Sequence, residues 1–175
     1  MDELREIISK YWDLVLGVFH LGVNCCGDDC IVRMLNIEHI RNLGCKVYGL
    51  MIDKRQIDEL LRYPSIIKSI LDRGINKIIT YPCISQDRIN FMSKLGFKVI
   101  NYISSNNCPL TEEVVIHLDA YRVIDLTNMG IKVYVHLYEP YIKDKPSYGI
   151  VTVLEPILEH LRRSNVKFYL ILDEL

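Results

Sequence analysis

The sequence predicts an α/β fold in which helices cover a mainly parallel sheet of about six strands. Three observations carry this prediction. Apolar runs rich in Val, Ile, Tyr and Phe recur along the chain, most of them follow a glycine or an asparagine, and amphipathic helical patterns lie between them. Runs that are apolar at nearly every position are typical of strands covered on both faces. The long separations between the runs favour parallel crossovers over hairpins.

One phrase repeats where helices are expected to end and strands to begin. It consists of Leu or Met, Gly, one further residue and a Lys-led apolar run. Its copies span residues 43–48, 95–100 and 129–134, with looser copies at 73–79 and at 163–169, where Asn165 replaces the glycine. Gly and, less often, Asn adopt the left-handed conformation that closes a helix. Each copy therefore predicts a helix followed at once by a short strand.

The apolar runs place strands at 14–21, 46–52, 77–82, 98–103, 132–138 and 167–173. Helical patterns span 3–12, 29–43, 55–73, 86–95, 111–128 and a last stretch after residue 151. We expect the third helix to break at Tyr63-Pro64, because a residue before proline avoids the helical region. Thr111 is the expected N-cap of the fifth helix. Thr152 and Glu155 have the form of a capping box that starts the sixth.

Two architectures use such units: an open three-layer αβα sandwich of the Rossmann-like kind, and a partial βα barrel. The eight βα units of a barrel normally take about 250 residues. A chain of 175 residues therefore favours the open sandwich. The same length fits a single α/β domain that spans residues 1–175.

Composition and charge exclude several classes of protein. The chain is 50% hydrophobic with a formal net charge of −1, so it lacks the basic excess typical of nucleic-acid binding. The apolar stretch from Leu14 to Val23 is interrupted by His20 and is shorter than a membrane span of about 20 residues. The N-terminus is acidic, unlike a secretory signal. The six cysteines are therefore expected to be free thiols in a reducing cytoplasm.

Candidate site residues follow the strands, because the site of a parallel α/β protein lies beyond the strand carboxyl ends. The candidate ligand-binding residues are His20, Asn24, Asp28, Asp29, Asp53, Ser104 and Tyr138. Three other residues are candidate catalytic residues. Cys83 stands before a helix whose N-terminus favours a thiolate, His136 interrupts an apolar strand, and Glu139 follows it as a candidate general base. The alternatives are a buried structural cysteine and a core histidine with a hydrogen-bond partner.

The segment from His20 to Cys30 is the most unusual stretch, with two glycines, three cysteines and two aspartates. It permits three interpretations. One is a tight turn with small buried thiols and an aspartate N-cap for the helix at 29–43. Another is an anion-binding turn at the N-terminus of that helix. The third is a metal or iron–sulfur site that uses Cys26 and Cys30, although the second cysteine pair typical of zinc sites is missing.

These observations predict a small α/β enzyme or binding protein, with transferases among the enzymes considered. Its ligand would be an anionic, nucleotide-like or phosphorylated small molecule at the strand carboxyl ends. No P-loop or G-x-G-x-x-G motif is present, and the sequence specifies no cofactor. One alternative is a non-catalytic interaction module that forms a homodimer. The other is a metal or iron–sulfur protein. We expect no nucleic-acid or membrane partner.

Overall fold

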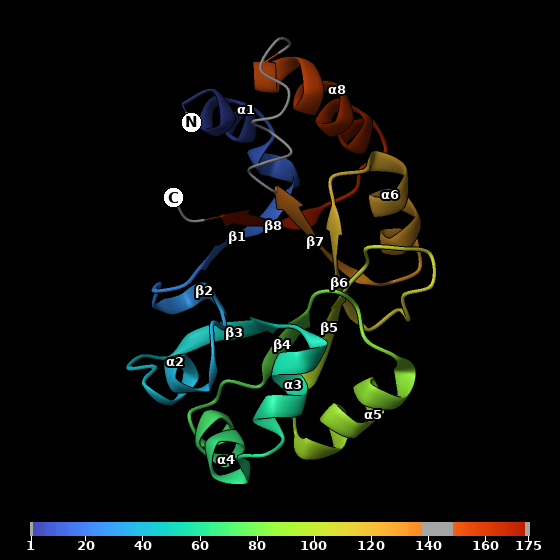
Figure 1. The fold of residues 1–175 in the computed structure, drawn as a ribbon. Coiled ribbons are helices and arrows are strands. Elements are labelled where there is room, and N and C mark those ends of the chain that lie inside the picture. Colours follow the sequence, from blue (N-terminus) through green and yellow to red (C-terminus); the bar gives the residue numbers. More distant parts are fainter. Residues whose placement is uncertain (1, 138–148, 174–175) are drawn as a thin grey trace. The chain divides into compact units, whose positions relative to one another are not determined.

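The computed structural model describes residues 2–137 and 149–173, in which helices and strands alternate along most of the chain (Figure 1). The strands are β1 Val15–Gly22, β2 Gly27–Arg33, β3 Val47–Ile52, β4 Lys77–Thr80, β5 Lys98–Tyr102, β6 Glu113–His117, β7 Lys132–Leu137 and β8 Phe168–Asp173. The helices are α1 Asp2–Lys10, the 3-10 helix η1 Trp12–Leu14, α2 Ile37–Arg41, α3 Lys54–Leu60, α4 Pro64–Asp72, α5 Gln86–Leu95, α6 Ala120–Asn128 and α8 Gly149–Arg163. The predicted α/β class is confirmed.

The strands follow one another in the sheet as they do along the chain, from β1 to β8. Neighbouring strands pair in parallel from β1–β2 to β5–β6, and so do β7 and β8. A doubly wound sheet reverses its strand order at a switch point, whereas pairing in chain order is the winding of a βα barrel. The predicted parallel sheet is therefore confirmed, but the Rossmann-like sandwich is wrong. The alternative, a βα-barrel topology, has the observed strand order.

The sandwich was predicted because a barrel with a helix in every connection needs a longer chain. Two connections of this chain contain no helix, so the barrel winding fits in fewer residues. Residues 23–26 join β1 to β2, and residues 103–112 join β5 to β6. Of the strands that follow, β2 overlaps the stretch 29–43 and β6 lies within the stretch 111–128, and both stretches were expected to be long helices. Only the shorter helices α2 and α6 form there, so these two helix predictions are wrong in part.

The other expected elements lie close to their predicted positions. Each of the six predicted strands is found within two residues of its expected bounds. α4 begins at Pro64, which confirms the expected break in the third helix. The capping box expected at Thr152 is wrong, because α8 already begins at Gly149 and contains Pro156 in its interior.

Four of the five copies of the repeated phrase have the left-handed conformation that they predict. Left-handed backbone occurs after α4, α5, α6 and α8, with φ angles of 79°, 109°, 81° and 52° at Gly74, Gly96, Gly130 and Asn165. At Gly96 the chain closes α5 by donating backbone N–H bonds to the last turn. A side chain with a Cβ is disfavoured in this region of the backbone map, which explains the glycine in three of these copies. Gly44 in the first copy does not have this conformation, so the prediction is wrong there.

The described chain forms two compact units, which we treat separately. The first unit comprises Met1–Phe19 and Ile116–Asp173, and the second comprises His20–Val115. The first therefore contains α1, η1, most of β1, the carboxyl end of β6 and the elements from α6 to β8. The second contains β2 to β5 with their helices α2 to α5 and the amino end of β6. The single domain expected from chain length stays a prediction.

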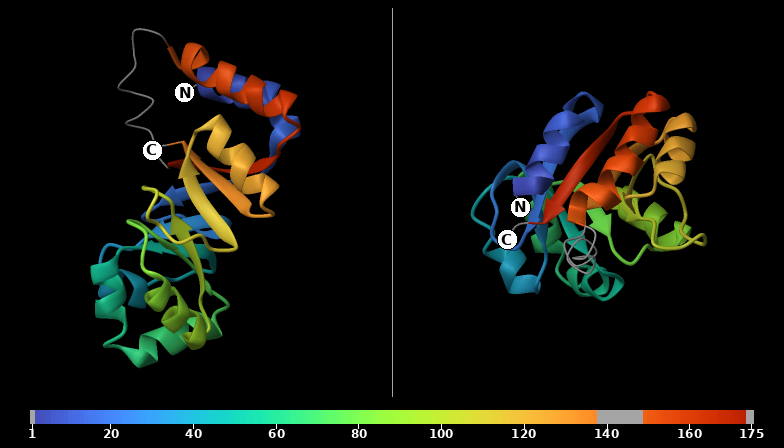
Figure 2. Two further views of the ribbon diagram at one scale, coloured as in Figure 1. Left: turned by 90° about the vertical axis from the view of Figure 1, so that its right-hand side faces the viewer. Right: turned by 90° about the horizontal axis from the view of Figure 1, so that it is seen from above.

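Helix α8 packs along α1 in the first unit, and the two lie side by side in both views of Figure 2. The apolar face of α8 consists of buried leucines at helical spacing, Leu154, Leu158 and Leu161. Arg162 reaches across to the end of α1, where its guanidinium lies 4.3 Å from the ring centre of Tyr11, the residue after the helix. Tyr11 is itself 4% exposed, so this cation–π contact lies against a buried ring.

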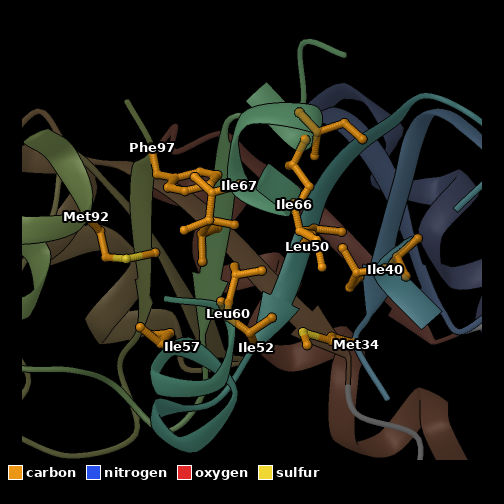
Figure 3. Close-up of a cluster of buried hydrophobic side chains, with 14 of the residues drawn as sticks. Met34, Ile40, Leu50, Ile52, Ile57, Leu60, Ile66, Ile67, Met92 and Phe97 are labelled. Carbon is orange, nitrogen blue, oxygen red and sulfur yellow. The ribbon is translucent and has the colours of Figure 1, made fainter. Parts of the chain in front are cut away.

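Helices α2 to α5 bury their apolar side chains against the strands of the second unit. Figure 3 shows Ile57 and Leu60 of α3 beside Ile52 of β3, and Ile66 of α4 beside Leu50. All five side chains are at most 7% exposed. Burying a side chain of this size contributes roughly 1.5–3 kcal/mol relative to leaving it in water. This cluster is the main core of the second unit.

All six cysteines are paired, and the three disulfides lie in the second unit: Cys25–Cys30, Cys26–Cys45 and Cys83–Cys108. The free thiols predicted from the sequence are therefore wrong. Disulfides persist in oxidising compartments and inside the cells of some hyperthermophiles. They favour an oxidising environment here, and the cytoplasmic location stays a prediction. Among the helices of residues 2–137 and 149–173, none combines the length and hydropathy of a membrane span.

Candidate functional site

Aromatic and ionisable side chains share one face of β7 and β8 in the first unit. Successive strand residues point to opposite faces, so Lys132, Tyr134 and His136 lie on the same face of β7. Tyr169 of β8 pairs with Tyr134, and their ring centres are 5.2 Å apart. The Lys132 ammonium lies 4.4 Å from the centre of the Tyr169 ring. From its amino to its carboxyl end, this face therefore carries an ammonium, two tyrosines and a histidine.

Strand β1 adds to this aromatic cluster within the first unit. The Phe19 ring lies 5.6 Å from that of Tyr134 in an edge-on arrangement, and 6.0 Å from that of Tyr169. A Cβ atom at position 17 would lie 3.2 Å from the Tyr169 ring, so Gly17 leaves the space that the ring needs. Tyr134 is fully buried. The cluster is a packed support for the histidine above it rather than an open cavity.

His136 is hydrogen-bonded to a carboxylate at the carboxyl end of the neighbouring strand. Its Nε2 atom lies 2.9 Å from Oδ1 of Asp173. Both side chains are shielded from water, since they are 4% and 15% exposed. An ionised carboxylate accepts the Nε2 proton, and it thereby fixes both the tautomer and the orientation of the ring. The predicted site residue His136 thus has an orienting partner.

A second histidine lies beside this pair. His117 ends β6, and its ring is stacked on that of His136 with centres 6.4 Å apart and planes inclined by 20°. Partial burial of the ring lowers the pKa of His117, and the charge of His136 lowers it further. Because the pKa lies below the ordinary value of about 6.5, His117 is neutral at pH 7 and can accept a proton.

The three side chains together provide the parts of an acid–base site. His117 is exposed although its ring is partly buried, so a molecule outside the strands can reach it. His136 is buried and held by Asp173. Two imidazoles in different environments are the arrangement in which one group accepts a proton and the other donates one. All three lie at strand carboxyl ends, where parallel α/β proteins place their functional residues.

Sequence reasoning missed His117 and Asp173. His117 falls in the stretch 111–128, whose pattern predicted a helix, and therefore no strand end was expected there. The signal against that assignment is Val114–Ile116, three consecutive β-branched residues that favour a strand. Asp173 occupies the carboxyl end of the last strand, a position that the strand-end rule itself indicates.

The other predicted catalytic residues do not join this site. Cys83 lies in the second unit and is bonded to Cys108, so it carries no free thiolate that could act as a nucleophile. Its alternative interpretation, a structural cysteine, fits the disulfide. Glu139 and the predicted ligand-binding residue Tyr138 lie outside the described residues.

The predicted anion-binding turn at 20–30 lacks the helix it requires. Asp28 and Asp29 lie in β2 with exposed side chains, and α2 begins only at Ile37, where Asn36 is the N-cap. His20 lies 3.9 Å from Asp29, and both side chains are exposed. Asn24 is also exposed in the β1–β2 connection. These residues therefore form a solvated strand end in the second unit and not the N-terminus of a long helix.

Asp53 and Ser104, the remaining predicted ligand-binding residues, have structural partners. The Asp53 carboxylate accepts from the backbone N–H of Gln56 at 2.7 Å, and the Gln56 side chain accepts from the Asp53 backbone at 3.0 Å. This capping box starts α3. The Ser104 hydroxyl lies 3.8 Å from the Cys108 sulfur.

Asn101 is a buried polar residue that ties together two carboxyl-end loops of the second unit. Its side-chain oxygen accepts from the Thr80 hydroxyl at 2.6 Å and from the Ile84 backbone at 3.0 Å. Its amide nitrogen donates to the carbonyl groups of Ile84 and Pro109 at 3.2 and 2.9 Å. The Cys83–Cys108 disulfide joins the same two loops. The hydrogen bonds of Asn101 and this disulfide both hold the backbone of the two loops in place, so we assign them a structural role.

The opposite, amino ends of the second-unit strands hold a carboxylate between two lysines. Glu113 is 3% exposed, and its two oxygens lie 3.3 Å from the Lys77 ammonium and 3.0 Å from that of Lys98. The hydrogen bond to Glu113 raises the pKa of Lys98. Residues at the amino ends of barrel strands serve stability more often than chemistry. The Lys-led strands of the sequence repeat therefore have a structural use here.

No group of histidine, cysteine or acidic residues within 2–137 and 149–173 is arranged to hold a metal ion. Cys26 and Cys30, the expected ligands of a metal or iron–sulfur centre, are bonded to Cys45 and Cys25. The metal hypothesis is therefore not supported. No protein-family model, curated protein or solved structure matches the chain. The chain is a parallel α/β protein with a histidine–aspartate pair at its strand ends.

Proposed function

We propose that the chain is a small acid–base enzyme, or a binding protein of the same design, for an anionic small molecule. The site consists of His117, His136 and Asp173 at the carboxyl ends of β6, β7 and β8 in the first unit. The observation that carries the proposal is the 2.9 Å hydrogen bond between the buried imidazole of His136 and Asp173, with His117 stacked beside it.

Each residue has a definite task in the proposed reaction. His117, neutral at pH 7 because its pKa is lowered, accepts a proton from the bound molecule. His136 provides the second imidazole, and in its protonated form it attracts an anionic group or returns a proton to the product. Asp173 orients the His136 ring and stabilises the positive charge that develops on it. The proton taken by one imidazole is balanced by the proton given by the other.

This chemistry is compatible with the transferase activity considered above, since activating a hydroxyl for group transfer requires a general base. Nucleotide-like and phosphorylated molecules are the proposed ligands because an imidazolium binds phosphate oxygens by charge-assisted hydrogen bonds. The exposed ring of His117 provides the access that such a ligand needs. The packed tyrosine and phenylalanine rings below His136 hold the strand faces in place.

A ligand screen that reports on the histidines tests this proposal. Inorganic phosphate, nucleoside phosphates and sugar phosphates are added to the full chain while the melting temperature and the imidazole NMR signals are recorded. We expect at least one compound to raise Tm by a few degrees and to shift the signals of His117 and His136. His117→Gln, His136→Gln and Asp173→Asn should each weaken binding about tenfold or more, the range found for charge-assisted contacts.

His160→Gln is the matched control, because His160 lies in the same unit on α8 and packs edge-on against Tyr121. It should leave ligand binding unchanged. If no compound stabilises the chain or shifts either histidine, the acid–base proposal is wrong. In that case sedimentation equilibrium tests the alternative of a non-catalytic homodimeric module.

A further inference from the structure

Two disulfides at the β1–β2 connection use adjacent cysteines but differ in exposure. In the inner disulfide, Cys25–Cys30, the two residues are 9% and 1% exposed. In the outer disulfide, Cys26–Cys45, Cys26 is exposed and Cys45 is partly exposed. The two bonds are neighbours in space, since the Cys45 sulfur lies 4.0 Å from the Cys25 carbonyl oxygen. A thiolate must reach a sulfur atom to attack it, so of these two disulfides only the outer one is open to reagents in water.

The outer disulfide secures a strand end where the hydrogen-bond ladder is interrupted. Gly27 pairs with Val47 of β3, and its N–H donates to the carbonyl of Lys46 at 3.1 Å. The register then shifts, and the next paired residue is Ile31, beside Gly49. The covalent bond one residue before Gly27 therefore holds the amino end of β2 at the place where strand pairing is irregular.

The third disulfide, Cys83–Cys108, is protected in a different way. Cys108 is 7% exposed, and its sulfur lies 3.6 Å from the Ser105 hydroxyl and 3.8 Å from that of Ser104. The two loops that it joins are also tied by the buried side chain of Asn101. Attack on the Cys108 sulfur would require these loops to open first, whereas Cys83 is partly exposed and therefore has only the ties between the two loops to protect it.

We propose that the outer disulfide is a redox switch, which an external dithiol opens while the other two disulfides remain oxidised. One thiolate of the dithiol attacks a sulfur of Cys26–Cys45, forms a mixed disulfide and releases the other cysteine as a thiolate. The second thiol of the dithiol then displaces the remaining cysteine. The products are two protein thiols and one oxidised cyclic dithiol, so two electrons and two protons pass from the dithiol to the protein.

Opening the switch releases a short acidic segment of the second unit. Residues 26–29 lose their covalent attachment to the chain before β3, while the inner disulfide still holds the segment at Cys30. The exposed Asp28 and Asp29 lie in this segment, and the 3.9 Å contact from His20 ends on Asp29. The switch thus changes the mobility of one charged strand end and leaves the core of the second unit in place. It acts independently of the histidine site proposed above.

Limited reduction of the full chain tests the switch. Protein purified without reductant is treated with a limiting amount of dithiothreitol at pH 7.5, quenched, alkylated and digested for mass spectrometry. We expect Cys26 and Cys45 to be alkylated at least ten times faster than the other four cysteines. Hydrogen exchange after this selective reduction should be at least tenfold faster at the amides of residues 26–29 and unchanged in β3, β4 and β5.

Two double variants complete the experiment. The double variant Cys26→Ser, Cys45→Ser should show the fast exchange at 26–29 without reductant and take up no label at the limiting dose. In the control, Cys83→Ser with Cys108→Ser, selective labelling of Cys26 and Cys45 should persist. The proposal is overturned if all three disulfides are reduced together, if the inner one is reduced first, or if selective reduction leaves the exchange at 26–29 unchanged. Six free thiols in protein purified without reductant would overturn it too.

Discussion

The two units of this chain differ in the interactions that stabilise each of them internally. The second unit carries three disulfides and a buried asparagine, Asn101, that joins two of its loops. The first unit has none of the six cysteines. It depends instead on the packing of α1 against α8 and on side-chain contacts such as that of Arg162 with Tyr11.

The two units also differ in what the polar residues at their strand carboxyl ends interact with. In the second unit, polar residues near the strand carboxyl ends are engaged by the backbone, as when Asp53 caps α3. In the first unit, the corresponding positions carry the ionisable side chains His117, His136 and Asp173, and His136 interacts with each of the other two. Groups that bond to backbone fix a structure, whereas titratable groups that meet at an exposed strand end are available for chemistry. This difference supports the proposal that acid–base chemistry belongs to the first unit.

The largest expected effect on stability is that of Asn101→Ala in the second unit. The change leaves the Thr80 hydroxyl, the Ile84 N–H and the Pro109 carbonyl without the partner that they have now. Each buried polar group left unsatisfied costs about 1–3 kcal/mol. We therefore expect a loss of about 3–5 kcal/mol in the free energy of unfolding, measured by urea denaturation with the disulfides intact.

Asn90→Ala is the matched control for this change. Asn90 is an exposed residue of α5 whose side chain accepts from Gln86 at 2.9 Å, so its loss should cost less than about 0.5 kcal/mol. A loss below about 1 kcal/mol for Asn101→Ala would contradict the comparison. It would show that Cys83–Cys108 alone holds the two loops.

The sequence predicts those parts of the fold that local signals determine. A left-handed Gly or Asn after a helix, followed by a β-branched run, correctly locates the boundaries before β4, β5, β7 and β8. β2 and β6 were missed because each is a short apolar run beside a residue that reads equally well as an N-cap. Asp28 and Thr111 are such residues, and short apolar runs do not distinguish strand from helix by periodicity. Without these two strands, the chain appeared too short for a barrel winding.

The site could be predicted only in part for a related reason. His136 was found because a histidine within an apolar strand must have a partner. Its partner Asp173 is 37 residues away in sequence. The pairing depends on β7 and β8 being neighbours, which the sequence does not reveal. The disulfides were missed because compartment was inferred from the N-terminus, whereas cysteine pairing depends on which loops the fold brings together.

A smaller effect is expected at the contact that fastens α1 to α8 in the first unit. The Arg162 guanidinium donates to the Lys10 carbonyl at 2.6 Å and pairs with Asp13 at 2.9 Å, in addition to lying over the Tyr11 ring. Its side chain is 39% exposed, so water screens these interactions. Arg162→Ala should lower the free energy of unfolding by about 1–2 kcal/mol.

The control for this change is the neighbouring Arg163→Ala. The Arg163 side chain is 79% exposed and its contact with Glu159 spans 3.9 Å, so the expected change is within about 0.5 kcal/mol. Hydrogen exchange should also show faster opening of α1 in the Arg162 variant only. If the two variants were equally stable, unit 1 would owe its cohesion to apolar packing alone.

The smallest expected effect is a dependence of stability on pH that arises from His117. The pKa of His117 is lowered in the folded chain by burial and by His136, whereas it is about 6.5 in an unfolded one. Between the two values the unfolded chain binds a proton that the folded chain does not. Stability therefore rises with pH through this window and is lost as the pH falls below about 6.5. In His117→Gln this loss should disappear, so the variant should retain more of its neutral-pH stability at pH 5 than the parent does.

Urea denaturation at pH 5 and 7.5 measures the difference, with His20→Gln as the control for removing an exposed histidine from the second unit. An identical pH dependence in parent and His117→Gln would mean that His117 is solvated like an ordinary surface histidine, and the first unit would then lose its proposed base.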